Sequence, residues 1–132
     1  MEPTLINLPK FLDLRGNLSF IEEDSQLPFK IKRVYWIYDV PGGEHRGGHA
    51  FRETEELIVA LSGSFDVLVH NGEIEHRFSL NRSYYGVLIP KMMWRKLENF
   101  STNSLALIIA STDFNEADYI REFEEFKHLK KK

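Results

Sequence analysis

Residues 41–63 read PGGEHRGGHAFRETEELIVALSG, and this stretch decides the fold. It opens with a Pro-Gly-Gly loop signal, and Gly63 closes the largely apolar run from Glu56 to Leu61. Side chains two residues apart on a strand point to the same side, so His49 and Phe51 share one face of any strand through them. The stretch therefore predicts strands separated by tight turns, with one histidine as the main candidate for chemistry.

The rest of the chain continues this pattern of short strands. The dipeptide Asn71-Gly72 lies between two such runs and predicts a hairpin, because both turn residues must tolerate positive φ. A helix is predicted only near the C-terminus, with Asp113 or Asn115 as N-cap and an apolar stripe through Ile120, Phe123 and Phe126. Strands are expected at residues 31–38, 56–61, 64–70, 73–80, 84–90 and 105–111, and one domain is expected over residues 1–132.

Composition excludes several classes of function. A net charge of −3 and a pI near 6.0 argue against nucleic acid as the main partner, because phosphate backbones attract basic surfaces. The chain has no cysteine, so it has neither a disulfide framework nor a thiolate site. Its longest apolar run, Leu105 to Ala110, is too short to cross a bilayer, and residues 1–4 show no signal pattern. The expected location is the cytoplasm, away from membranes.

The spacing of residues 43–63 resembles the first motif of the cupins, Gly-x5-His-x-His-x3,4-Glu-x6-Gly. The matching positions are Gly43, His49, Glu56 and Gly63, and Phe51 stands in place of the second histidine. The end of the second motif, Pro-x-Gly-x2-His-x3-Asn, resembles residues 90–99, with Pro90 and Asn99 kept, Met92 in place of the glycine and Arg95 in place of the histidine. This resemblance implies an all-β fold, a cupin-like antiparallel β-barrel (jelly roll), here with a short C-terminal helix.

The same replacements argue against a metal site. In ordinary cupins the motif histidines and the glutamate ligate a metal ion. Phe51 cannot ligate, and Arg95 places a permanent cation where the ion would be. His49 and Glu56 are too few ligands by themselves, so we expect neither a metal nor another cofactor.

Arginines near the expected mouth of the barrel favour an anionic ligand instead. A guanidinium can bind two phosphate oxygens at once, and the candidates are Arg15, Arg33, Arg46 and Arg95. An isolated arginine on a strand is more often a solvated surface residue, whereas the motif spacing directs Arg46 and Arg95 toward the pocket or its rim. Aromatic residues such as Tyr35, Trp36 and Trp94 offer flat faces for a base or sugar, although core packing is the commoner role of each.

Over nearly its whole length the chain resembles the sugar 3,4-ketoisomerases that act on dTDP-4-keto-6-deoxy-D-glucose in pathways to bacterial surface sugars. The likeness is carried by residues 13–18, 31–35, 46–50, 61–64, 99–101 and 117–121. It implies a cupin-like barrel, a homodimer with exchanged N-terminal strands, no metal, and a thymidine diphosphate held by arginines.

The resemblance also implies roles for single residues. His49 would be the base that removes the C3 proton, Arg95 or a pocket tyrosine such as Tyr35 would stabilise the enediolate, and Arg15, Arg33 and Arg46 would bind the substrate. These enzymes usually carry His-x-His, and here the second position is Phe51. Three interpretations therefore stay open: His49 works alone or with a tyrosine, the protein catalyses a related sugar-nucleotide epimerisation, or it is a non-catalytic cupin that binds nucleotide sugars or carbohydrates.

Overall fold

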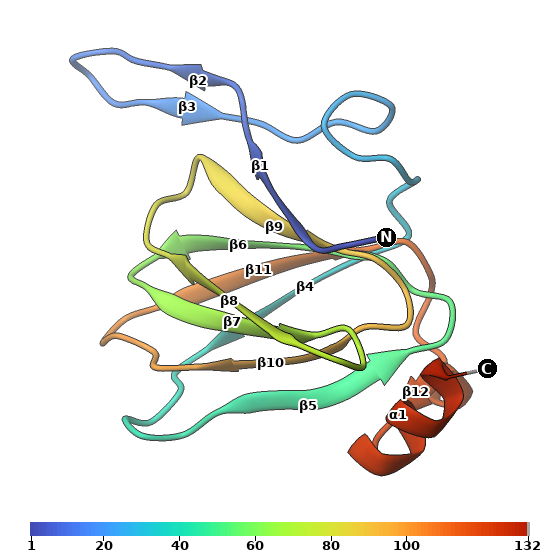
Figure 1. The fold of residues 1–132 in the computed structure, drawn as a ribbon. Helices are drawn as coiled ribbons and strands as arrows, with labels where there is room; N and C mark the ends of the chain where they lie inside the picture. Colours follow the sequence, from blue (N-terminus) through green and yellow to red (C-terminus); the bar gives the residue numbers. More distant parts are fainter. Residues whose placement is uncertain (132) are drawn as a thin grey trace.

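The structure, a computed structural model, describes residues 1–131 and consists mainly of two antiparallel sheets (Figure 1). One sheet has the strand order β1 (Thr4–Asn7), β9 (Tyr85–Ile89), β6 (Glu56–Ser62), β11 (Leu105–Ala110) and β4 (Arg33–Tyr38). The other has the order β12 (Tyr119–Ile120), β5 (Arg46–Phe51), β10 (Trp94–Glu98), β7 (Phe65–His70) and β8 (Glu75–Leu80). A separate hairpin pairs β2 (Lys10–Phe11) with β3 (Leu18–Ser19).

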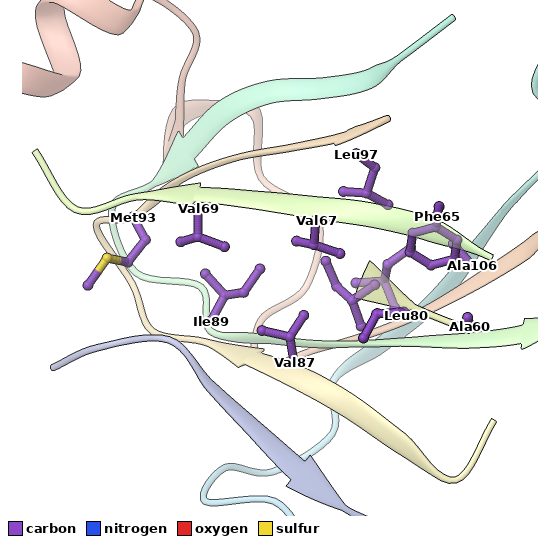
Figure 2. Close-up of a cluster of buried hydrophobic side chains, with 12 residues drawn as sticks. Ala60, Phe65, Val67, Val69, Leu80, Val87, Ile89, Met93, Leu97 and Ala106 are labelled. Atoms are coloured by element: carbon purple, nitrogen blue, oxygen red, sulfur yellow. The ribbon is translucent and has the colours of Figure 1, made fainter. Parts of the chain in front are cut away.

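The main core lies between the inner faces of the two sheets. Figure 2 shows Val67 and Val69 of β7 facing Val87 and Ile89 of β9, and all four side chains are fully buried. Burying side chains of this kind contributes about 1.5–3 kcal/mol each relative to leaving them exposed. The packing of these inward-facing apolar side chains therefore holds the two sheets together.

This architecture confirms the expected all-β, cupin-like jelly roll with a C-terminal helix. The strands expected at residues 31–38, 56–61, 64–70, 73–80, 84–90 and 105–111 all form, with ends displaced by no more than two residues. Across residues 1–131 the hydrogen bonds divide the strands into separate sheets, so the arrangement is an open sandwich and not a closed barrel.

Two turns show why the motif positions favour glycine. Gly63 has φ of +67°, and a Cβ there would lie 2.5 Å from Ser101 Oγ and 2.8 Å from Ser104 Cα. Met92 replaces a motif glycine and still adopts the left-handed conformation, with φ of 58°. Met92 therefore keeps the turn that precedes β10, although this backbone is unfavourable for a residue with a side chain.

The C-terminal segment differs from the predicted helix. Asn115 does act as a cap, because its side chain accepts a hydrogen bond from the Ala117 amide at 3.1 Å. It caps only the 3-10 turn η1 (Glu116–Asp118), after which the chain forms β12 and pairs with β5. The helix α1 (Phe123–Lys130) begins later, so Ile120 of the predicted stripe belongs to a strand, and Phe126 is buried against Ala50 and Ile120.

The hairpin of β2 and β3, which we call the N-terminal arm (residues 10–19), projects away from the two sheets (Figure 1). Its apolar side chains are largely exposed, namely those of Phe11, Leu12, Leu14 and Leu18. No helix within residues 1–131 is long and apolar enough to cross a membrane.

Candidate active site

A cavity of about 510 Å³ is lined by residues of both sheets and by the segment around β12. It contains most of the chemically active side chains singled out from the sequence: Tyr35 of β4, Arg46 and His49 of β5, and Arg95 of β10. The pairing of β5 with β10 places His49 directly opposite Arg95. The two cupin-like motifs therefore meet in one site, as their spacing predicted.

His49 lies in the cavity as a neutral imidazole. Its Nε2 is buried and makes no hydrogen bond to any residue of the described chain. Burial, followed by the positive charges of Arg95, Arg121 and Arg33, lowers the pKa of His49 from 6.5 to about 3. At neutral pH the ring is therefore uncharged, and the same burial and positive charges disfavour its protonated form in the empty cavity.

Phe51 fills the position of the second motif histidine with a fully buried ring. The ring centroid lies 4.8 Å from that of His49, 4.7 Å from that of Tyr119 and 4.9 Å from Cζ of Arg95. The face of an aromatic ring attracts a guanidinium, more strongly where water is excluded. Phe51 thus packs against His49, Tyr119 and Arg95, and it has no group that could carry a proton.

Glu56 connects two of the predicted catalytic residues. Arg95 Nη1 donates to Glu56 Oε1 at 2.6 Å, and the Tyr35 hydroxyl donates to Glu56 Oε2 at 2.5 Å. The side chains of both Arg95 and Glu56 are only 2% exposed. Arg95 Nε donates to the Met93 carbonyl at 3.3 Å, whereas Arg95 Nη2 is buried without a partner in the described chain. The site therefore holds a rigid arginine with one free donor.

The rim of the cavity is basic. Arg46 is exposed and, within residues 1–131, forms no ion pair. Arg121 is held by Glu116 through contacts of 2.8 and 3.0 Å, and its Cζ lies 4.2 Å from the centroid of the Tyr119 ring. The carboxylate of Glu56 is already paired with Arg95, so it does not offset the positive charge of Arg46 at the rim. The rim is therefore suited to an anionic ligand.

Two of the arginines expected to bind substrate lie elsewhere. Arg33, at the start of β4, is half-buried over the rings of Tyr35 and Phe114 at 5.4 and 5.7 Å, and its Nε has no partner in the described chain. It is next to the cavity but does not line it. Arg15 lies in the N-terminal arm, has a side chain that is 90% exposed, and pairs with Asp13 at 2.8 Å. A single chain does not bring Arg15 to the cavity.

The sequence alone assigns no chemical role to three residues that line the site, Glu56, Tyr119 and Arg121. Glu56 was recognised as the motif carboxylate, but without a role once the metal was rejected. Tyr119 and Arg121 were hidden because their segment was interpreted as helix. The structure places them through Asp118, whose carboxylate accepts hydrogen bonds from the Glu53 amide at 2.7 Å and from the Thr54 hydroxyl.

The donor atoms of the site do not suit a metal ion. Among residues 1–131 no three His, Cys, Asp or Glu side chains gather as metal ligands require. Both oxygens of Glu56 already accept short hydrogen bonds, and Arg95 brings a positive charge next to them. A divalent cation would have to displace these partners.

Comparison with known proteins defines the family. The profile described as "FdtA: WxcM-like, C-terminal" matches residues 1–131. The chain belongs to the FdtA family. One relative, the TDP-4-oxo-6-deoxy-alpha-D-glucose-3,4-oxoisomerase of Aneurinibacillus thermoaerophilus, is 39% identical over 127 residues, which cover 96% of this chain and 91% of the relative.

Solved structures agree with the FdtA assignment. A 3,4-ketoisomerase from Helicobacter canadensis has a TM-score of 0.96 and 36% identity, with 100% of this chain and 99% of that chain covered. The sugar 3,4-ketoisomerase QdtA from Thermoanaerobacterium thermosaccharolyticum, solved in complex with TDP, has a TM-score of 0.95 and 30% identity, with 98% and 94% covered. The recognition of this ketoisomerase family from the sequence is thereby confirmed.

Proposed function

We infer that the protein is a sugar-nucleotide 3,4-ketoisomerase, which moves a carbonyl group from C4 to C3 of a dTDP-linked 4-keto-6-deoxyhexose. The observation that supports this most directly is that the neutral His49, whose Nε2 has no hydrogen-bond partner in the described chain, lines the same cavity as Arg95. Membership of the FdtA family and the similarity to a TDP-4-oxo-6-deoxy-glucose oxoisomerase name the reaction class.

His49 acts as the base in this proposal. The carbonyl at C4 acidifies the proton at C3, and the imidazole removes it to give an enediolate. The negative charge of the bound diphosphate raises the proton affinity of the imidazole, since an anion near a histidine favours its charged form. His49 can then return the proton to C4, which completes the isomerisation without a metal or other cofactor.

Arginines provide the remaining electrostatic stabilisation. Arg95, fixed by Glu56 and the Met93 carbonyl, directs its free Nη2 to the enediolate oxygen, and Tyr35 lies beside it. Arg46 at the rim holds the diphosphate, with Arg33 as a nearby second cation. We propose that the product is used in the biosynthesis of a bacterial surface sugar. The reaction takes place in the cytoplasm, and one domain over residues 1–132 catalyses it.

A homodimer with exchanged N-terminal strands is part of the proposal. The N-terminal arm exposes four apolar side chains, and β1 is held only at the edge of its sheet by β9. A second exposed apolar surface, formed by Val34, Trp36 and Leu61, lies on the outer side of the same sheet. A symmetric dimer covers such surfaces with a second copy, and it offers Arg15 a route to the partner's cavity.

One observation favours a second candidate, a cupin that binds nucleotide sugars without catalysis. Phe51 leaves His49 without a neighbouring histidine, and burial makes the protonated ring unfavourable in the empty cavity. Such a protein needs only the cationic rim, which both candidates share.

Incubation with dTDP-4-keto-6-deoxyglucose in deuterated water separates the two. The enzyme forms the 3-keto isomer and incorporates deuterium at the carbon that receives the proton, which NMR detects. A protein that binds TDP and yet leaves every dTDP-4-keto sugar unchanged, without exchange at C3, is the binding cupin.

A further inference from the structure

The isomerisation moves two protons, and the described site provides an obvious carrier for only one. The carbon-bound proton travels from C3 to C4, and the hydroxyl proton on O3 must reach O4. His49 serves the carbon-bound proton, whereas Phe51 can carry none. The other titratable side chains that line the cavity and could carry a proton near neutral pH are Tyr35, His45, Glu56 and Tyr119.

The pair of Tyr35 and Glu56 has the geometry of such a carrier. Their oxygen atoms are 2.5 Å apart, and both residues line the cavity. Arg95 fixes the carboxylate from its other side at 2.6 Å, so that the pair is held by strands of both sheets. The hydroxyl of Tyr35 can therefore exchange a proton with a buried carboxylate behind it.

The charges around the pair keep it ready for proton transfer. Burial raises the pKa of Glu56 above its ordinary value, against the opposing effects of Arg95 and Tyr35, so that the carboxylate accepts a proton more readily. Burial and then the charge of Glu56 raise the pKa of Tyr35, which keeps the phenol protonated. A proton can thus pass through the phenol oxygen to Glu56 and return.

The other candidates lack a comparable partner. Tyr119 is surrounded by the rings of His49, Phe51 and Phe114 and by the Arg121 guanidinium, none of which can store a proton for its hydroxyl, since His49 already serves the carbon-bound proton. His45 lies exposed in the loop before β5.

We propose that the Tyr35–Glu56 pair carries the hydroxyl proton from O3 to O4 while His49 carries the carbon-bound proton from C3 to C4. The proposal rests on the ketoisomerase function and adds Glu56, which acts through Tyr35, to its machinery.

The steps balance without an oxidant or a further reactant. His49 takes the C3 proton, the electrons of that C–H bond form the C3=C4 double bond, and the carbonyl electrons move to O4. Tyr35 then accepts the proton from O3 as its own proton passes to Glu56. The O3 electrons form the new carbonyl, and the C3=C4 electrons take the proton back from His49 at C4. Finally Tyr35 gives a proton to O4 and recovers one from Glu56.

Two conservative variants, Tyr35→Phe and Glu56→Gln, test the proposal. Each reaction is run in deuterated water with dTDP-4-keto-6-deoxyglucose, and NMR measures both the 3-keto product and the deuterium at C3 of the recovered substrate. Because removal of the C3 proton by His49 precedes the hydroxyl transfer, exchange should fall less than about 10-fold while product formation falls about 100-fold or more. Tyr38→Phe removes a hydroxyl from the exposed face of the same strand and should leave both rates unchanged.

A purely structural role predicts a different result, in which exchange and product formation fall by the same factor in both variants. That result, or a Tyr119→Phe variant that separates the two rates while Tyr35→Phe does not, overturns the proposal. If Glu56→Gln does not fold, as circular dichroism and TDP binding will reveal, Tyr35→Phe decides alone. An unaltered protein that makes no 3-keto product instead refutes the underlying function.

Discussion

The substitution His49→Asn separates catalysis from binding most directly. Asparagine is smaller than histidine and remains polar, but it cannot take up a proton near neutral pH. The variant loses the ring contacts of His49 with Phe51 and Tyr119, with centroids at 4.8 and 5.0 Å. Aromatic pairs contribute about 0.5–1.5 kcal/mol each, so the free energy of unfolding should fall by about 1–3 kcal/mol. A typical domain tolerates this loss.

Catalysis should fall much further. A general base typically contributes 10²–10⁴-fold, so turnover by His49→Asn should drop by about that factor, or about 3–5 kcal/mol of activation free energy. Exchange at C3 in deuterated water should fall in parallel, because both rates depend on the same proton removal. TDP affinity, measured by calorimetry, should change less than about threefold, since the arginines of the rim are untouched. The exposed His128→Asn on α1 is the matched control.

Full exchange in His49→Asn would refute this reasoning and move the base elsewhere. The next candidates are His45, at the rim, and Tyr35. A His45→Asn variant that loses exchange while His49→Asn keeps it would identify the loop histidine as the base.

Three further predictions follow from the site. Arg46→Ala should lower the affinity for TDP, measured by calorimetry, about 10- to 150-fold, the equivalent of about 1.5–3 kcal/mol, and leave the affinity for thymidine unchanged. The exposed Arg82→Ala is the control, and equal losses for both ligands would argue against a diphosphate contact. The pKa of His49 is lowered to about 3, so the ring is neutral above that pH and kcat/KM should stay constant from about pH 5.5 to 8. A fall in kcat/KM below an apparent pKa near 6.5 would contradict the lowered pKa of His49. Elemental analysis should find no stoichiometric transition metal in the purified protein, because Phe51 and Arg95 occupy ligand positions, and a metal bound through His49 and Glu56 would disprove that.

Local sequence patterns predicted the strands well because each predicted strand is either a largely apolar run, as in β6 and β11, or an alternation of polar and apolar residues, as in β8. Residues 105–111, for example, form β11 almost as expected, since such an apolar run suits a central strand. Motif spacing likewise predicted that His49 and Arg95 meet, although they lie on different strands. Periodicity therefore predicted most of the strands, and the resemblance to the cupin motifs predicted the fold and the centre of the site.

Long-range hydrogen bonds account for what the sequence did not reveal. Residues 115–120 resemble the start of a helix, because Asn115 is followed by acidic residues suited to a first turn. Asp118 instead accepts hydrogen bonds from Glu53 and Thr54, which lie more than sixty residues earlier. These bonds hold the segment where Tyr119 pairs, as part of a strand, with Phe51. No local pattern encodes a partner so distant in the chain. Arg15 shows the same limit, since its place in a dimer depends on a second copy.

The pairing of Phe51 with Arg95 explains how a cupin pocket can lose two ligands and remain a compact site. A buried guanidinium is costly unless it is paired, and Glu56 provides the opposite charge at 2.6 Å. The ring of Phe51 covers the guanidinium at 4.9 Å, where a histidine would bring a second titratable group beside a permanent cation. The two replacement side chains are therefore in direct contact. Together they turn a set of metal ligands into a fixed cation with one free donor, which suits the stabilisation of an oxyanion next to His49.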